Sequence, residues 1–281
     1  MTSVVIAAHN EAAVIGRCLD SLLADAAPNE FDITVAANGC TDDTAKVAAA
    51  RGVRVLDLPD PGKPGALNAG DAVAVGFPRV YLDADILITT DALRALAAAV
   101  TGPALASTAR RELDLRGRPL PVRAYFSVHR HLPALRNGLF GRGVIVLSET
   151  GRARFDRFPD MVADDLFVDS LFTLDEKRQV ESVPSVVATP RTTRDLVRRL
   201  IRVRAGNTAM RAAAARGEIK AEVRAAGRSS WLKDVVLRRP WLAPAAVGYV
   251  GITLYAASKA KRNPDTGWGR DESTRQEEAN A

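Results

Sequence analysis

The sequence predicts an α/β fold: an open, mostly parallel sheet with helices on both faces, followed by a helical C-terminal extension. Three observations carry this prediction. Short apolar runs alternate with helix-periodic segments four times in the first hundred residues. A polar residue or a turn signal follows each apolar run, and arginine is dense from Arg191 to Arg239. Such alternation is typical of a parallel sheet that helices cover on both sides.

The elements of the first half follow from the spacing of their apolar residues. Uninterrupted apolar runs such as SVVIAA predict buried parallel strands. Apolar residues at helical spacing, such as Val14, Cys18 and Leu22, predict an amphipathic helix. In chain order we expect strand 3–8, helix 11–24, strand 31–39, helix 41–51, strand 53–58, a Pro/Gly loop and helix over 59–75, strand 79–86 and helix 90–100.

The second half is less regular. We expect strands within 103–114 and 180–190 and at 144–147, the last preceded by glycines that permit close backbone approach. Helices are expected over 161–174 and, rich in arginine, over 194–216. The predicted regions are an α/β domain at 1–190, a basic helical extension at 191–262 and a polar tail at 263–281.

The composition narrows the class of partner. The 281 residues carry a net charge of +6, which favours nucleic acid, anionic lipid or phosphorylated ligands. Aromatic and basic residues do not interleave as they do in single-strand binders, so phosphates and membrane are preferred over nucleic acid. Cys18 and Cys40 lack metal or redox spacing, and the N-terminus has no signal-peptide pattern. We therefore expect a cytoplasmic location.

Residues 241–257 form an uncharged stretch between Arg238-Arg239 and Lys259. The stretch is shorter than the roughly 20 apolar residues that a spanning helix needs, and Pro244 weakens it further. The sequence leaves three placements open: a segment at the inner face of the membrane, a helix packed on the protein, or a contact with a second subunit in a homodimer.

Polar residues follow all four predicted strands of the first half. They are His9 and Glu11, Asn38, the loop at 59–65, and the pair Asp83 and Asp85. The carboxyl ends of parallel strands meet at one edge of the sheet, where ligands of such folds bind. An acid–X–acid pair at that edge suits a hard divalent cation such as Mg²⁺ or Mn²⁺, which prefers oxygen ligands and bridges to phosphates. A solvated turn is the alternative for this pair.

Five motifs, taken together, resemble family 2 glycosyltransferases with the GT-A (Rossmann-like) nucleotide-sugar-binding fold. They are VVIAAHNEAAVIGRCLDSLL, ITVAANGCTDDT, GKPGALNAG, YLDADI and ADDLFV, in that order, over about residues 3–170. The resemblance implies an inverting, metal-dependent hexosyltransferase that uses a nucleotide-diphosphate sugar. It also implies that 1–190 is the catalytic domain.

The resemblance implies roles for the first two strand ends. Ala8, His9 and Glu11 take the places that receive the nucleotide base and ribose. Ala37 and Asn38 stand where relatives usually carry two acids. The amide of Asn38 can still hydrogen-bond a base or ribose, so it is kept among the donor-binding residues.

The DXD-type motif and the preceding loop take the remaining donor roles in the resemblance. Lys63 corresponds to a lysine near the diphosphate, and a cation facing a diphosphate is physically reasonable. Asp83 corresponds to the acid that contacts the ribose. Asp85 corresponds to the acid that holds the metal, where the ion acts as a Lewis acid on the leaving phosphate.

The second acidic motif supplies the base in the resemblance. Asp165 is implied as the general base that deprotonates an acceptor hydroxyl, and Asp164 as a residue that shapes the site or binds acceptor. Capping of a helix N-terminus is the structural alternative for both acids. Arg202 and Arg204, in RRLIRVRAGN, correspond to a basic segment that can close over phosphates; a solvated helix face is their alternative.

Two other functions remain open at this point. One is a retaining GT-A transferase, and the other is a non-catalytic, membrane-peripheral protein that binds nucleotide sugars. A UDP-sugar is the expected donor, with GDP and dTDP open. The acceptor is expected to be a cell-envelope glycan, a lipid-linked intermediate or a small molecule.

Overall fold

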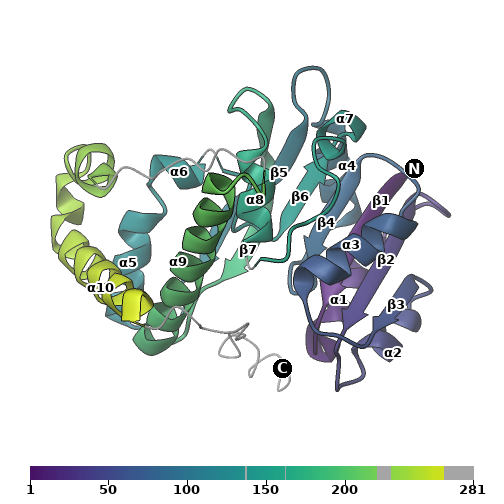
Figure 1. The fold of residues 1–281 in the computed structure, drawn as a ribbon, viewed down its shortest axis with the longest axis horizontal. Coiled ribbons are helices and arrows are strands. Elements are labelled where there is room, and N and C mark those ends of the chain that lie inside the picture. Colours follow the sequence, from purple (N-terminus) through teal and green to yellow (C-terminus); the bar gives the residue numbers. More distant parts are fainter. Residues whose placement is uncertain (137, 162, 220–228, 263–281) are drawn as a thin grey trace. The chain divides into compact units, whose positions relative to one another are not determined.

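Strand β1 (Thr2–Ala8) lies inside a seven-stranded sheet of order β3-β2-β1-β4-β6-β5-β7 in the computed structural model (Figure 1). The structure describes residues 1–136, 138–161, 163–219 and 229–262, so the predicted tail at 263–281 lies outside the described residues. The other strands are β2 (Phe31–Asn38), β3 (Arg54–Leu58), β4 (Arg79–Asp83), β5 (Ala106–Asp114), β6 (Val144–Leu147) and β7 (Lys177–Ala188).

Helices alternate with the strands through the first hundred residues, as the sequence predicts. They are α1 (Ala12–Leu23), α2 (Thr44–Ala49), α3 (Lys63–Val73) and α4 (Thr90–Ala98). The later helices are α5 (Leu120–His129), α6 (Pro133–Arg136), α7 (Glu149–Arg152), α8 (Asp164–Ser170), α9 (Thr193–Ala215), the short η1 (Trp231–Val236) and η2 (Pro240–Leu242), and α10 (Ala243–Arg262). Helix α8 is shorter than the predicted 161–174, and α5, α6 and α7 were not predicted.

Strands β3, β2, β1 and β4 are parallel neighbours, which confirms the predicted open α/β sheet. Strand β6 runs antiparallel to both β4 and β5, so the sheet as a whole is mixed. The register pairs Ala8 with Ala37 and Ala7 with Asp83. Four carboxyl-terminal strand ends therefore meet at one edge of the sheet.

Helices cover both faces of the parallel half, because alternate residues of a strand point to opposite sides. On one face Val4 and Ile6 are fully buried in a core cluster that includes residues of α1, α2 and α4. On the other face Val5 meets α3, where a Cβ added to Gly70 would lie 2.5 Å from Val5 Cγ1. Glycine at position 70 thus lets α3 pack directly on β1.

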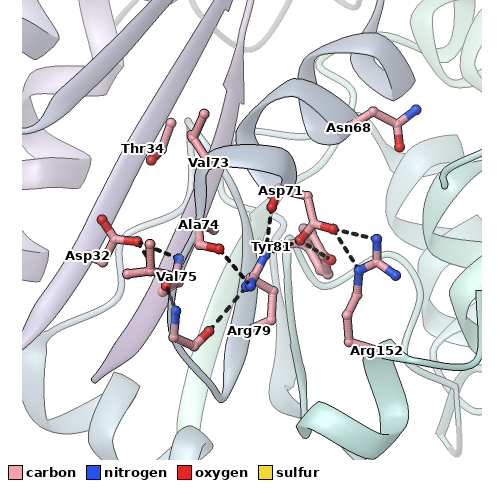
Figure 2. Close-up of polar contacts among 12 residues, drawn as sticks. Asp32, Thr34, Asn68, Asp71, Val73, Ala74, Val75, Arg79, Tyr81 and Arg152 are labelled. Atoms are coloured by element: carbon pink, nitrogen blue, oxygen red, sulfur yellow. Dashed lines mark hydrogen bonds and ion pairs between the residues drawn. The ribbon is translucent and has the colours of Figure 1, made fainter. Parts of the chain in front are cut away.

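A buried polar cluster holds the end of α3 to β4 and to the end of α7. Figure 2 shows Asp71 between two arginines: it is ion-paired with Arg79, and its Oδ2 accepts from Arg152 Nε at 2.7 Å. Tyr81 Oη donates to Asp71 Oδ1 at 3.0 Å. Burial, followed by the charge of Asp71, raises the pKa of Tyr81 above its ordinary value. Every charge in this cluster therefore has a partner, as buried charges require.

The chain forms two units. The first unit comprises Met1–Glu112, Leu139–Asp160 and Leu171–Val187, and the second comprises Leu113–Gly138, Met161–Ser170 and the chain from Ala188 on. The second unit therefore starts its last segment near the predicted boundary at 191, but it also includes two segments of the predicted 1–190 domain.

The second unit has a hydrophobic core of its own. Residues of α5, α9, η1 and α10 form it, and the rings of Tyr125 and Tyr249 pack within it with centroids 5.1 Å apart. The apolar residues of α5 that enter this core are spaced as on one face of a helix: Val122, Tyr125, Phe126 and Val128.

Candidate functional site

The loops after β1 and β2 are joined by hydrogen bonds at the carboxyl edge of the sheet. His9 Nδ1 donates to the carbonyl of Asn38 at 2.6 Å, which assigns a hydrogen to that nitrogen. Thr41 N–H donates to Asn10 Oδ1 at 2.7 Å, and Glu11 N–H donates to Thr44 Oγ1 at 2.7 Å. These contacts fix the first loop against the second before any ligand arrives.

The side chain of Asn38 connects two other segments of this edge through hydrogen bonds. Its side chain is buried, its Nδ2 donates to the carbonyl of Ala8 at 2.8 Å, and its Oδ1 accepts from Gly62 N–H at 2.9 Å. Ala8 is fully buried as well. In this structure the amide of Asn38, which the resemblance places on a base or ribose, ties the first loop to the loop before α3.

Strand β4 ends at Asp83, and a turn follows at once. Ile86 N–H donates to the carbonyl of Asp83 at 3.1 Å, and Asp85 lies within this turn, exposed to solvent. Asp83 keeps 40% of its side chain exposed. Both acids therefore lie at the end of a buried strand without being buried themselves, so neither pays the cost of burying a charge.

Gly143, directly before the neighbouring strand β6, supports the backbone of this turn. Its carbonyl accepts from Asp83 N–H at 2.8 Å, and its φ of +73° is one that glycine adopts without strain. A Cβ at this position would lie 2.2 Å from Ile86 Cγ1. The close backbone approach predicted for the glycines before 144–147 is confirmed here.

Lys63 joins the acids at the start of α3. Its Nζ lies 2.8 Å from Asp83 Oδ1, and the lysine side chain is 28% exposed. The helix that carries Lys63 is anchored further along by Asn68, whose Nδ2 donates to the carbonyl of Phe158 and whose Oδ1 accepts from Phe158 N–H. The cation therefore sits on a helix fixed at several points.

Three carboxylates at this edge affect the pKa of one buried thiol. Burial first, and then the charges of Asp85, Asp83 and Glu11, raise the pKa of the Cys18 thiol on α1 to about 12. Three acids from two separate strand ends thus act on the same buried atom. This edge therefore presents several carboxylate oxygens, the ligands that a hard cation prefers.

The carboxylates at this edge fit a hard divalent ion that is bound partly by the protein and partly by a substrate. Among the residues that the structure describes, no group of three or more His, Cys, Asp or Glu side chains could hold a metal ion. Mg²⁺ is commonly held by one or two carboxylates together with substrate phosphates. The exposed carboxylate of Asp85, with Asp83 two residues before it, supplies that kind of partial site.

The remaining predicted site residues belong to the second unit. Asp164 and Asp165 form the first turn of α8, both half-buried, and Leu166 N–H donates to Asp165 Oδ1 at 2.8 Å. Arg202 and Arg204 lie on α9, also half-buried. Burial raises the pKa of Tyr249 on α10. The positive charge of Arg204 acts on this pKa in the opposite direction.

The loop contacts of Asn10, Thr41 and Thr44 were not predicted from sequence. The φ of +52° at Asn10 is left-handed, a conformation that asparagine tolerates better than most residues. An asparagine or threonine in a loop, however, gives no sign of which distant backbone group it will bind. Only the register of β1 against β2 makes these partners neighbours.

Comparison with known proteins identifies the family. The sequence profile described as Glycosyl transferase family 2 matches residues 3–152, which is more than half of the chain. The chain belongs to glycosyl transferase family 2. Among curated proteins, none matches this sequence significantly.

Solved structures of glycosyltransferases share the fold. The chain is similar to a mannosyltransferase from Pyrobaculum calidifontis in complex with GDP-Man and Mn²⁺, with a TM-score of 0.59 and 18% identity over 94% of this chain and 81% of that one. It is also similar to glucosyl-3-phosphoglycerate synthase from Mycobacterium tuberculosis in complex with Mn²⁺, UDP and phosphoglyceric acid. There the TM-score is 0.50 and the identity 22%, over 67% of this chain and 71% of that one. These likenesses confirm the GT-A-like fold of this family 2 glycosyltransferase.

Proposed function

We propose that this protein is a metal-dependent, inverting glycosyltransferase that moves a hexose from a nucleotide-diphosphate sugar to an acceptor hydroxyl. The observation that carries the proposal is the arrangement at the end of β4. Asp85 lies exposed in the turn, Asp83 precedes it, and Lys63 contacts Asp83 at 2.8 Å. Carboxylates for a cation and an ammonium group for phosphate oxygens are the groups that a sugar nucleotide with its metal requires.

In this proposal each residue of the carboxyl edge has one task. Asp85 would hold Mn²⁺ or Mg²⁺, and the bound ion would supply Lewis-acid stabilisation of charge on the leaving diphosphate, while Asp83 would contact the ribose. Lys63 pairs with phosphate oxygens once its contact with Asp83 is exchanged. His9 and Glu11 bind the base and ribose on loops that their backbone contacts already order.

Asp165 is proposed as the general base. It accepts the proton of the acceptor hydroxyl while that oxygen forms a bond to the anomeric carbon and the nucleoside diphosphate leaves with the electron pair of the broken bond. One displacement of this kind inverts the anomeric configuration. Support comes from the resemblance of ADDLFV to the second acidic motif of the family and from the position of Asp165, half-buried in the first turn of α8.

The donor and acceptor are proposed more broadly. A UDP-sugar is the default donor; GDP-Man in the mannosyltransferase structure and UDP in the synthase structure support nucleotide diphosphates of either kind. The acceptor is a glycan, a lipid-linked intermediate or a small metabolite. A cytoplasmic location is part of the proposal.

A ligand screen tests the donor half of the proposal. Thermal unfolding is followed with UDP, GDP, dTDP and their sugar conjugates, each with Mn²⁺, with Mg²⁺ and without a metal ion. At about 100 times Kd the expected stabilisation is ~2.7 kcal/mol, which corresponds to a rise in Tm of about 5–10 °C. If no nucleotide diphosphate raises Tm with either ion, the proposal is wrong.

Substitution of the base tests the catalytic half. Asp165→Asn is expected to lower kcat by about 10²–10⁴-fold while donor affinity, measured by calorimetry, stays within about twofold. Asp175→Asn makes the same chemical change at an exposed position and is the matched control. Normal turnover by Asp165→Asn would remove this residue from the mechanism. Retention of the anomeric configuration, read by NMR of the product, would favour the retaining alternative.

A further inference from the structure

Helix α10 and the turn before it expose a line of large apolar side chains. We call Leu237, Trp241, Val247, Leu254 and Tyr255 the apolar stripe; their exposed fractions are 70%, 71%, 75%, 64% and 54%. Exposed apolar side chains that gather on one element indicate a surface that a membrane or another protein covers. Single exposed apolar side chains scattered over a surface are normal. The members on α10 recur at helical spacing, so they share one face of the helix.

The opposite face of α10 is part of the protein core. Ala246, Tyr249 and Ala256 are buried, and Tyr249 packs on Tyr125 of α5 within the core of the second unit. Residues 240–260 are long and apolar enough to cross a membrane, and this is the one such helix among the described residues. A spanning placement, however, would surround the helix with lipid and strip Tyr249 from its core contacts. The geometry therefore favours a helix that lies in the plane of a surface.

The charged residues around the apolar stripe indicate which kind of membrane surface it would contact. From Val235 to Ala260 the sequence has no carboxylate, and its charged residues are Arg238, Arg239 and Lys259. Arg238 and Lys259 are exposed at the two ends of the stripe, and Lys259 Nζ lies 5.8 Å from the centroid of the Tyr255 ring. Basic residues beside a buried apolar face are attracted to anionic lipid headgroups.

A second copy of the chain fits this surface less well. A two-fold pairing of antiparallel stripes would bring Arg238 of each copy toward Lys259 of the other. Like charges at both ends of such an interface oppose it, whereas phosphate groups at both ends favour lipid.

We propose that α10 seats the protein on an anionic membrane, with the apolar stripe at the boundary of headgroups and acyl chains and with Arg238 and Lys259 at lipid phosphates. The arrangement is that of an interfacial helix that lies on the bilayer. This inference does not depend on the proposed transferase activity, because its test requires no turnover. If both hold, acceptors embedded in the membrane become the favoured substrate class.

Flotation with lipid vesicles tests the proposal on the full chain. Vesicles of phosphatidylcholine alone are compared with vesicles that contain about 30% phosphatidylglycerol. The expected partition coefficient is at least about tenfold higher for the anionic vesicles, and 1 M NaCl is expected to release the protein, since headgroup attraction is screened by salt. Equal binding to neutral vesicles that resists carbonate extraction would indicate a spanning helix and would overturn the proposal.

Two variants separate the apolar and the charged contributions. Leu254→Asp is expected to lower partition at least about tenfold, because the side chain no longer enters the apolar layer. Leu174→Asp changes an apolar residue that is 48% exposed elsewhere and is expected to have no effect. The double substitution Arg238→Ala, Lys259→Ala is expected to lower binding to anionic vesicles and leave binding to neutral ones unchanged.

The remaining outcomes also decide the question. If the wild-type chain stays in solution at every lipid composition, the proposal is wrong. If sedimentation shows a dimer that Leu254→Asp dissociates, and vesicles do not compete with it, the stripe is a subunit interface and the proposal is wrong. Circular dichroism and Tm of each variant show that lost binding does not arise from unfolding.

Discussion

Charged side chains lie at both ends of strand β4, but those at one end are buried and those at the other end are exposed to solvent. At the amino end, Arg79 is 5% exposed and Asp71 is 9% exposed, and Arg152 completes the group (Figure 2). At the carboxyl end, Asp83 is 40% exposed and Asp85 lies in an exposed turn. Charges that compensate one another in the interior belong to the fold, whereas carboxylates that solvent reaches at a ligand edge can exchange their contacts for a ligand.

Removal of the exposed acid is expected to give the largest effect on catalysis and almost none on stability. Asp85→Asn should lower kcat/KM about a thousandfold, roughly 4 kcal/mol, because the proposed ion on the leaving diphosphate would lose its ligand. The urea midpoint should stay the same. Transfer assays and urea unfolding measure both quantities. A variant that turns over normally but unfolds earlier would place Asp85 in the fold, as Asp71 is.

Removal of the buried acid is expected to give the reverse pattern. Asp71→Asn leaves the guanidinium groups of Arg79 and Arg152 without a counter-charge, which should cost about 3–5 kcal/mol of unfolding free energy. Asp91→Asn breaks an ion pair with Arg94 in which the aspartate is 83% exposed, and this control should cost under about 1 kcal/mol. Equal losses from the two substitutions in urea titrations would contradict the distinction between buried and exposed pairs.

Gly143→Ala is expected to affect both properties moderately. The new methyl group would lie 2.2 Å from Ile86 Cγ1 at a φ of +73°, so the turn that carries Asp83 must shift. We expect a loss of about 1–3 kcal/mol in stability and a parallel fall in activity. Gly102→Ala has a similar φ of +60° but open space around it, and its loss should stay near ~1 kcal/mol with activity unchanged.

A partly exposed ion pair in the first unit gives the smallest expected effect. The hydrogen bond from Arg154 lowers the pKa of Glu176 from 4.5 to about 2. A lowered carboxylate pKa stabilises the fold above the unfolded value, so this contribution is complete above about pH 5 and disappears as the pH falls from 4.5 toward 2. Arg154→Met should therefore be less stable than wild type at pH 6 but not at pH 2. A difference that persists at pH 2 in urea titrations would indicate packing instead.

The sequence predicts the parallel half of the molecule well for a physical reason. Buried strands must be apolar and the residues after them must be polar, so the positions of Asp83, Asp85 and Lys63 at one edge follow from the order of elements alone. No such rule applies to Asn38. Its residue type suits a ligand contact as well as it suits a loop contact, and only the fold shows that its amide binds Ala8 and Gly62.

Long-range partners and short helices escape prediction for a different reason. Asp71 and Arg152 are 81 positions apart, and local patterns do not pair residues over such distances. Helix α5 has only ten residues and begins after Pro119, so its apolar spacing covers less than three turns. Its partners in the core of the second unit lie on α9, η1 and α10, which are far along the chain.

The difference between the two cysteines has a practical consequence. Cys18 is buried and its thiol stays protonated at neutral pH, so it should resist alkylation in the native protein. Cys40 is partly exposed, and its Sγ accepts from Asn10 N–H at 3.4 Å between the two loops that His9 and Asn38 join. A maleimide dye should therefore label Cys40 and not Cys18. The fluorescence of that dye would then report ligand binding at those two loops in the wild-type chain.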